Sequence, residues 1–494
     1  MRGGKEPFIP IGVGQGVYVL HQQFSFWLVK GLRLSTVIDL TKVDDLDTIK
    51  EIIMTTPLGF DLLKDTLYRQ VQQLPDHRQG SPNTRYTIQD AVLGAFGIFF
   101  TQSPSFLEYQ RRLQHTKGHN NAHTLFDVQQ IPCDNQVRKL LDPLAPSALD
   151  PVFVEVFEGL ETHRMLAHFR VLGDQLLVAL DGTQYFSSKA IHCPNCLTRQ
   201  LSNGQTLYYH AAITPVIVCP GHSQVLALPP EYIMPQDGHD KQDCERAAGK
   251  RWLAKHAPQV APHGVTLLGD DLYSNQPFCA LVLQHGFNFI LTCKPDSHPK
   301  LSERLAFWQA TDAITAHEAR HFNGRFTEVT MVRYMNDVLL RSGAEALSVN
   351  WFDLTVINAK TGEQLYHNSC ITNHCLTADT VVDVAHAGRG RWKIENENNN
   401  VLKTKGYHLE HNFGHGQQYL SAFLLSLNLL AFLFHTVLEW SDAKYALLRQ
   451  VIARRQSFFQ DIQALMRYMI FDSWDHLIDF MIRGLELESQ FDTT

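Results

Sequence analysis

Two short apolar runs in the middle of the chain each end in an acidic residue. Residues 176–180 (Leu-Leu-Val-Ala-Leu) lead into Asp181, and residues 265–269 (Val-Thr-Leu-Leu-Gly) lead into Asp270 and Asp271. Uninterrupted apolar runs of this length are typical of buried strands. Ligands of open α/β sheets bind at the carboxyl ends of the strands, so we expect these acids to lie at one edge of a sheet.

The pattern from residue 175 to 295 predicts the order β-β-β-α-β-α-β. Besides the two runs above, strands are expected at 207–212 with 216–218, at 225–228 and at 287–291. A helix is expected from about Lys241 to His256, capped by Asp240. A second helix should begin at Ser274-Asn275 with Pro277 in its first turn, since helix starts favour such residues.

A third acid lies in a helix-like segment within residues 389–416. Arg391, Glu395 and Asn399 are spaced four residues apart, so they share one helical face. Ile394 and Val401 face another way, which we interpret as inward. An acid flanked by cations and amides suits a metal ion with phosphates held nearby. Taken alone, this stretch also fits a solvated amphipathic helix.

The flanking regions complete an α/β chain, α+β overall, with a mixed sheet and flanking helices. Asp270 and Glu395 are 125 positions apart, which is too long for a simple loop. Gly118–Asn121 is expected to break a helix. The predicted organisation is an irregular extension at 1–34, a helical N-terminal module at 35–165, a core at 170–295 and 376–440, a β-rich insertion at 296–375, and C-terminal helices at 441–494.

Composition is that of an ordinary globular protein of 494 residues, with 44% hydrophobic and 19% charged residues. The net charge of −7 argues mildly against nucleic-acid binding, although basic clusters occur at 250–255, 389–405 and 449–455. Nine cysteines and no recognised signal peptide fit a reducing cytoplasm. The longest apolar run, Tyr419–Phe434, contains Ser421, Ser426 and Asn428, and we interpret it as a buried core helix rather than a membrane span.

Three segments carry a family resemblance: L-D-G-T at 180–183, G-D-D-L-Y-S at 269–274 and R-W-K-I-E-N at 391–396. In this order they resemble the catalytic segments of the DDE transposases of bacterial insertion sequences, which have an RNase H-like fold. The resemblance spans about 175–435, with a looser likeness at 84–160. In that family the second acid precedes a tyrosine by three residues, which selects Asp270 over Asp271.

The third acid of that family belongs to a Y-x2-R-x3-E-x6-K signature. Arg391 and Glu395 match its arginine and glutamate. The tyrosine position is occupied by Gly388, so no role of that tyrosine is carried over. The lysine position is occupied by Leu402, and Lys403 follows one residue late.

The resemblance implies metal-dependent DNA cleavage at transposon ends followed by strand transfer. Asp181, Asp270 and Glu395 would hold two Mg²⁺ or Mn²⁺ ions. The implied DNA contacts are phosphate binding by Arg391, Lys403 and Lys405, and base packing or stacking by Tyr273 and Trp392.

The implied partners are double-stranded transposon ends and target DNA, with a dimer in the DNA complex, in the bacterial cytoplasm and without a membrane. The helical N-terminal module would recognise DNA ends or serve only for packing. Two alternatives remain open: a structure-selective nuclease without strand transfer, and an inactive DNA-binding relic.

A separate group of residues has the spacing of zinc ligands. His192, Cys193 and Cys196 are followed by His210, Cys219 and His222. One interpretation is a structural zinc held by Cys193, Cys196, His210 and Cys219, and the other is free thiols near a turn. The roles of two further residues stay open. Glu245 either lies on a solvated helix face or supports the metal-binding acids. His415 either contacts phosphate or caps a turn.

Overall fold

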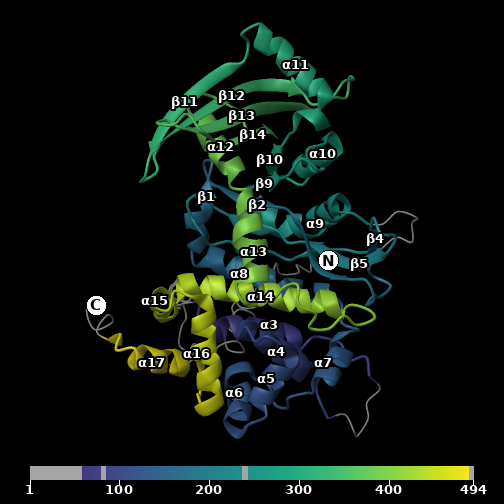
Figure 1. Cartoon of the computed structure of the whole chain (residues 1–494), viewed down its shortest axis with the longest axis vertical. Coiled ribbons are helices and arrows are strands. Elements are labelled where there is room, and N and C mark those ends of the chain that lie inside the picture. Colours follow the sequence, from purple (N-terminus) through teal and green to yellow (C-terminus); the bar gives the residue numbers. More distant parts are fainter. Residues whose placement is uncertain (1–57, 79–84, 236–242, 489–494) are drawn as a thin grey trace, which may run out of the picture.

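The computed structural model describes residues 58–78, 85–235 and 243–488, which form an α+β fold with two sheets. Figure 1 shows strands β11–β14 at one end of the molecule and helices α3–α7 at the other, with α14 between them. The predicted extension at 1–34 and the predicted helix cap Asp240 lie outside the described residues.

The larger sheet contains both apolar runs that end in acids. Its central part has the order β7-β6-β2-β9-β10. β2 pairs in parallel with β9, and β9 pairs in parallel with β10, while β6 is antiparallel to both β2 and β7. A short strand, β1 (Arg170–Val171), pairs with β2. The bounds of the central strands are β2 Gln175–Ala179, β6 Val216–Val218, β7 Leu226–Ala227, β9 Val265–Gly269 and β10 Asn288–Thr292.

The strands of the predicted insertion extend this same sheet. β14 (Gln364–Thr372) pairs antiparallel with β10, and β13 (Ser348–Asn358), β12 (Thr327–Leu339) and β11 (Thr315–Phe322) follow outward. A helix, α11 (Pro299–Ala310), precedes them. Residues 296–375 are therefore rich in strands, as expected, and are joined by hydrogen bonds to the sheet of the core.

A second, smaller sheet has the order β3-β5-β4, with β8 paired to β5. Its strands are β3 (Gly182–Ser188), β4 (Leu197–Gln200), β5 (Thr206–Ile213) and β8 (Glu231–Ile233). The run 207–212 was expected in the main sheet and belongs here instead. The reason is that β3 begins directly after Asp181 and pairs with β5 along its length, so that the chain leaves the main sheet before it returns at β6.

Two helices connect the central strands. α9 (Glu245–Val260) begins four residues later than expected from Lys241, and Cys244 occupies its N-cap position. α10 (Gln276–Gln284) begins as predicted, because the Asn275 side chain accepts from the Phe278 amide at 3.2 Å and Pro277 lies in the first turn. The start of α10 is thus set by local sequence alone.

The N-terminal helices form a module whose apolar residues belong to one continuous core with the sheets and the C-terminal helices. Their bounds are α3 Phe60–Val71, α4 Ile88–Phe100, α5 Phe106–Leu113, α6 Thr116–Phe126, α7 Asp134–Leu141 and α8 Asp150–Thr162, with short 3-10 turns at Pro146–Leu149 and Met165–Phe169. The predicted break at 118–121 is wrong, because α6 runs through it. Asn121 is fully buried there, and its Nδ2 donates to the Met466 and Met469 carbonyls at 2.8 and 2.7 Å. Contacts with α16 (Arg455–Tyr468) therefore outweigh the local preference of this sequence for a helix break.

The C-terminal helices begin with the long apolar helix α14 (Leu420–Ser441). It is long and apolar enough to cross a membrane, yet 94% of its most apolar window is buried, so it is a core helix as predicted. It packs between α4 and β7. Its polar residues have partners: Ser426 Oγ lies 2.5 Å from the Tyr232 hydroxyl, and Asn428 Nδ2 donates to the Tyr407 carbonyl at 2.9 Å. α15 (Ala443–Val451), α16 (Arg455–Tyr468) and α17 (Trp474–Gly484) follow.

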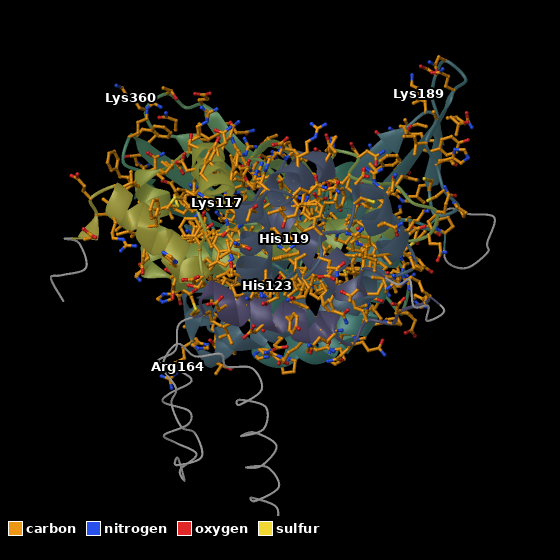
Figure 2. The ribbon with its side chains drawn as sticks, turned by 90° about the horizontal axis from the view of Figure 1, so that it is seen from below. Lys117, His119, His123, Arg164, Lys189 and Lys360 are labelled. Atoms are coloured by element: carbon orange, nitrogen blue, oxygen red, sulfur yellow. The ribbon has the colours of Figure 1, made fainter. Side chains whose placement is uncertain are left out.

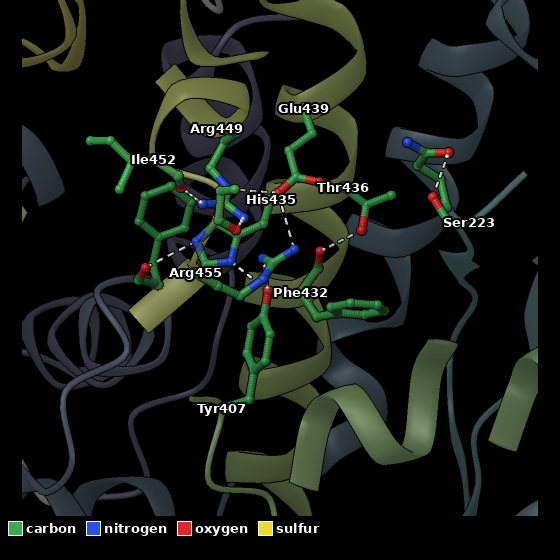
Figure 3. A network of polar contacts seen from close by, with 12 residues as sticks. Ser223, Tyr407, Phe432, His435, Thr436, Glu439, Arg449, Ile452 and Arg455 are labelled. Atoms are coloured by element: carbon green, nitrogen blue, oxygen red, sulfur yellow. Dashed lines mark hydrogen bonds and ion pairs between the residues drawn. The ribbon is translucent and has the colours of Figure 1, made fainter. Parts of the chain in front are cut away.

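A buried polar network joins these helices to the chain that precedes α14 (Figure 3). His435 Nε2 donates to the Phe100 carbonyl at 2.9 Å, so its Nδ1 accepts from the Tyr407 hydroxyl at 2.7 Å. Arg455 donates to that hydroxyl at 2.9 Å and to Glu439 at 3.0 Å. Burial lowers the pKa of His435 well below its usual value. The neutral imidazole thus ties α4, α14 and α16 to the segment that follows the Glu395 helix.

Candidate active site

Asp181 and Asp270 follow neighbouring parallel strands at the same edge of the main sheet. Ala179 lies opposite Leu268 in the β2–β9 pairing, and the Leu180 amide donates to the Leu268 carbonyl at 2.9 Å. The two acids each lie two residues beyond the Ala179–Leu268 pair, at the ends of the two strands. This is the placement that the two apolar runs predict.

Glu395 reaches the same place from a helical segment between α12 (Val381–Arg389) and α13 (Asn400–Thr404). Residues Ile394–Asn399 form a π-helix, η6, where an α-helix was expected. Ile394 is fully buried and anchors the segment, while the Glu395 side chain is half exposed. Arg391 Nη2 lies 2.8 Å from Glu395 Oε1, which confirms that these two side chains share one face. π-Helical turns are rare and occur frequently at functional sites.

The carboxylates are close enough to perturb one another. The pKa of Asp181 is raised to about 7, chiefly by burial, then by the negative charges of Glu245 and Glu395, with Asp270 adding to them and Arg391 opposing them. Asp270 and Glu395 thus both lie within electrostatic reach of Asp181. A fourth carboxylate, Glu245, joins them.

Glu245 is the first residue of α9 and points toward this cluster. Burial raises its pKa, while the Tyr273 hydroxyl and the Gly182 amide lower it. Its Oε1 is buried and has no hydrogen-bond partner among the described residues. A Cβ at Gly182 would collide with the Glu245 carboxylate, so a side chain at position 182 would displace this carboxylate from its place beside Asp181. Of the two interpretations of Glu245, the structure favours support of the acids over a solvated face.

An amide network orients Asp181. Asn399 Nδ2 donates to Asp181 Oδ2 at 3.4 Å, and Asn399 Oδ1 accepts from the Thr214 hydroxyl at 3.1 Å. Asn398 Nδ2 donates to Thr214 Oγ1 at 3.2 Å. The sequence placed Asn399 on the face of Glu395 but gave it no role. Nothing in the sequence around Thr214 pointed to this site, because the contact arises from packing between segments far apart in the chain.

Asp271 turns away from the cluster. Its Oδ1 accepts from the Lys294 amide at 2.7 Å, its Oδ2 accepts from the Ser297 hydroxyl, and His298 Nε2 lies 3.6 Å from Oδ1. Strand β9 ends at Gly269, so Asp271 lies in a turn and not in a continuing strand. Its carboxylate holds the loop after β10 and does not face the cluster, whereas Asp270 contributes to the electrostatic field at Asp181.

Tyr273 does not fit the role expected of it. The side chain is fully buried, with its ring 4.8 Å from that of Phe278, and it fills the space left by Gly249 and Gly269. Burial raises the pKa of its hydroxyl well above the usual value, and the adjacent Glu245 carboxylate raises it further. Stacking on a DNA base is therefore excluded for Tyr273. The aromatic ring supports the fold beneath the acids.

Of the other predicted DNA-contacting side chains, Trp392 and Lys405 are exposed, Lys403 is partly exposed and Arg391 is mostly buried. Trp392 is 38% exposed, and Lys393 Nζ lies 5.1 Å from its ring centroid. Lys403 Nζ is 3.0 Å from Glu410 Oε1, and Lys405 is exposed. Arg391 is mostly buried and pairs with Glu395. These placements leave Trp392, Lys403 and Lys405 accessible to a ligand.

The absence of a tyrosine at position 388 has a packing reason. A Cβ at Gly388 would lie 2.8 Å from Ile290 Cγ2 and 3.4 Å from Phe352 Cζ. Helix α12 therefore crosses β10 and β13 too closely for a large side chain. Tyr366 on β14 lies nearby, with the Arg389 guanidinium 5.0 Å from its ring centroid.

The predicted zinc ligands are brought together only in part. Cys193, Cys196 and His210 meet on the smaller sheet, and the fourth member of the group is His415. The prediction that Cys219 is the fourth ligand is wrong. Cys219 follows β6 in the main sheet, and its Sγ donates to the carbonyls of Pro220 and His168 at 3.4 and 3.7 Å. The spacing of cysteines along the chain gave no signal for a ligand 219 residues beyond Cys196.

No protein-family model matches the chain, and no curated protein is similar to it at a significant level. The geometry of the site therefore carries the functional argument by itself.

Proposed function

We propose that this protein is a DDE transposase that cleaves DNA at transposon ends and transfers the strands by metal-dependent phosphoryl transfer. The observation that carries the proposal is the meeting of Asp181 and Asp270, at the ends of adjacent parallel strands, with Glu395 from a separate helical segment. Carboxylates from three separate segments in one place are the ligand set that hard divalent cations require.

The strand order supports an RNase H-like core. The central strands follow the chain as β2, β6, β7, α9, β9, α10 and β10, with the first strand in the middle of the order β7-β6-β2-β9-β10. This β-β-β-α-β-α-β connectivity is the one that the resemblance implies. On this reading the strands β11–β14 are an insertion between the last core strand and the helix that carries Glu395.

The chemistry of the carboxylates fits a divalent cation. Burial and the neighbouring acids raise the pKa of Asp181 to about 7, and Glu245 Oε1 is buried with no hydrogen-bond partner among the described residues. Asp181, Asp270 and Glu395 would hold two Mg²⁺ or Mn²⁺ ions, with Glu245 beside them. When bound, such ions activate a water or a DNA 3′-hydroxyl and stabilise the leaving oxygen at phosphorus.

The remaining side chains position the acids and the DNA. Asn399 holds Asp181 by its amide, and Arg391 holds Glu395 by an ion pair. Lys403 and Lys405 at the surface would bind neighbouring phosphates, and exposed Trp392 would stack on a base near the cut. Arg391 would contact a phosphate while it keeps Glu395 in place.

The helical N-terminal module offers a surface for DNA-end recognition. Lys117, His119 and His123 are exposed on α6, and Figure 2 shows them on the underside of the molecule. Of the three, Lys117 carries the formal positive charge, so it is the residue through which α6 would contact a phosphate at some distance from the acids. The implied assembly is a dimer in which two such modules hold two transposon ends.

The proposal is tested with the full-length protein and labelled DNA from the sequence that flanks its gene. We expect Mg²⁺-dependent nicking at a fixed position, joining of the 3′ end to a target plasmid, and loss of both in the Asp181→Asn and Glu395→Gln variants. The Asp271→Asn variant is the matched control and should keep cleavage. Cleavage without joining would favour the structure-selective nuclease, and DNA binding without cleavage would favour the inactive relic; either result would overturn the transposase assignment.

A further inference from the structure

We propose that Cys193, Cys196, His210 and His415 bind one structural Zn²⁺ ion. Their four potential ligand atoms all lie within 4.8 Å of one another, and all four side chains are buried. Two thiols and two imidazoles are a ligand set typical of structural zinc. The site is separate from the carboxylate cluster and does not depend on the proposed function.

The distances within the group match a tetrahedral zinc site. Cys193 Sγ and Cys196 Sγ are 3.9 Å apart. His210 Nε2 lies 3.5 and 3.6 Å from these two sulfurs, and His415 Nε2 lies 3.5 Å from Cys196 Sγ. A tetrahedron with Zn–S of about 2.3 Å and Zn–N of about 2.0–2.1 Å has edges of about 3.8 Å between sulfurs and about 3.6 Å between sulfur and nitrogen. Four of the six distances between the ligand atoms thus match the edges of such a tetrahedron, and the other two do not exceed 4.8 Å.

The local fold arranges these ligands without help from the ion. Residues 193–196 form a tight turn, in which the Cys196 amide donates to the Cys193 carbonyl at 3.1 Å and the Cys193 amide donates to Cys196 Sγ at 3.4 Å. His210 comes from the middle of β5, and its ring stacks on Tyr185 with centroids 5.8 Å apart. The Cys-x-x-Cys turn and the β5 strand therefore supply three ligands from one small sheet.

The fourth ligand comes from the segment after the Glu395 helix. The ring of His415 packs on Phe186 with centroids 4.4 Å apart. The next residues are held from the other side by Asp142, whose Oδ1 accepts from the Gln417 and Gln418 amides at 3.1 and 3.0 Å. His415 Nδ1 is buried and has no hydrogen-bond partner among the described residues, so the polar contact of this ring is the one that its Nε2 makes with Cys196 Sγ.

The ion would join two parts of the chain that both lead to the carboxylates. Strand β3 begins directly after Asp181 and continues into the loop with Cys193 and Cys196, while His415 lies twenty residues after Glu395. A metal bridge between them closes a chain separation of 219 residues from Cys196 to His415. It would fix the segment 405–419 against the smaller sheet.

The alternative is a group of free thiols and imidazoles joined by weak hydrogen bonds. In that case the cysteines would react with thiol reagents whether or not a chelator is present, and the protein would contain no zinc. In the proposed site the two thiolates are protected until the ion is removed. This difference gives an experiment that does not require any variant to fold.

We would express the full-length chain in zinc-supplemented medium, purify it without chelators and measure bound metal. The expected result is one Zn²⁺ per chain, and Co²⁺ in its place should give the visible absorption of a tetrahedral site with two thiolates. A strong zinc chelator should release the ion and expose two additional thiols to a thiol reagent. Protein without zinc that neither binds Co²⁺ nor shows a change in reactive thiols would overturn the proposal.

Variants then decide which residues are the ligands. Cys193→Ser and His415→Ala should lose the stoichiometric zinc, while Cys219→Ser should keep one ion per chain. Loss of zinc in Cys219→Ser together with its retention in His415→Ala would overturn the assignment of the fourth ligand. Hydrogen exchange on the wild-type chain before and after chelation should increase in residues 405–419 and in β5, where the bridge is lost.

Discussion

Replacement of Asp181 by asparagine is expected to stabilise the metal-free protein at alkaline pH. Burial and the charges of Glu245 and Glu395 raise the pKa of Asp181 from 3.8 to about 7, against the opposing charge of Arg391. Between these two values the folded chain holds a proton that the unfolded chain has released, so stability falls as the pH rises. Above pH 7 the ionised Asp181 destabilises the folded state, and the asparagine removes that charge while it preserves the size of the side chain.

The size of this effect follows from the pKa. Since one pKa unit corresponds to about 1.36 kcal/mol, the rise from 3.8 to about 7 corresponds to at most about 4 kcal/mol, of which neighbouring acids share a part. At about 2.1 cal/mol/K of unfolding entropy per residue, 1 kcal/mol moves the Tm of a 494-residue chain by about 1 °C. The variant should therefore melt up to about 4 °C above the wild type at pH 8, and the difference should fall to less than half by pH 5.

The assay is thermal unfolding of both proteins from pH 5 to 8 in metal-depleted buffer, with Asp271→Asn as a control that lacks this alkaline gain. Addition of Mg²⁺ at pH 8 should stabilise the wild type, by about 2.7 kcal/mol at one hundred times its Kd, and should leave the Asp181→Asn variant nearly unchanged. A variant that melts below the wild type at pH 8, or a difference that does not change with pH, would refute the electrostatic argument.

Three further predictions concern side chains around the cluster. Asp270→Asn should abolish Mg²⁺-dependent DNA cleavage, whereas Asp271→Asn should keep it and lower Tm, because Asp271 holds the loop after β10; equal loss of cleavage in both would contradict the choice of acid. Arg391→Ala should weaken binding to every DNA end and reduce the slope of log affinity against log salt by about 0.9, one phosphate contact. Parallel slopes with unchanged affinity would instead assign Arg391 only to its ion pair with Glu395, 2.8 Å away. Trp392→Ala should weaken binding of single-stranded ends by about 1–3 kcal/mol if the ring stacks on a base, as titration by fluorescence anisotropy would measure; no change would remove Trp392 from the interface.

Local sequence features predicted those strands and helix starts that depend only on neighbouring residues. The strands before Asp181 and Asp270 are uninterrupted apolar runs that are buried in the sheet, and the start of α10 is fixed by the Asn275 cap. The same reasoning failed for residues 118–121, where Asn121 is buried against the carbonyls of Met466 and Met469. The local sequence does not show that a polar side chain in a helix will donate hydrogen bonds to backbone carbonyls far away in the chain.

The residues of the candidate sites were also predicted only in part. The three acids are recognisable because each stands in a distinctive context, at a strand end or on a charged helix face. Tyr273 was misassigned because a tyrosine after an acid does not reveal whether it points outward or fills the space over two glycines. His415 was not identified as a ligand because it meets Cys196 only through tertiary packing.

The π-helix at 394–399 changes how distances along this chain correspond to positions in space. A hydrogen-bonded π turn contains one residue more than an α turn, so a single such turn acts as a one-residue insertion in an otherwise α-helical segment. Each residue after the π turn therefore occupies the position that the residue before it would have on an uninterrupted α-helix. Lys403 thus takes the place that residue 402 would have on an uninterrupted α-helix, while Leu402 turns into the core. Under the proposed transposase function, the extra residue of the π turn would account for a lysine at position 403 where the signature has it at position 402. Deletion of one residue within 394–399 would restore the expected numbering and rotate Asn399 away from Asp181.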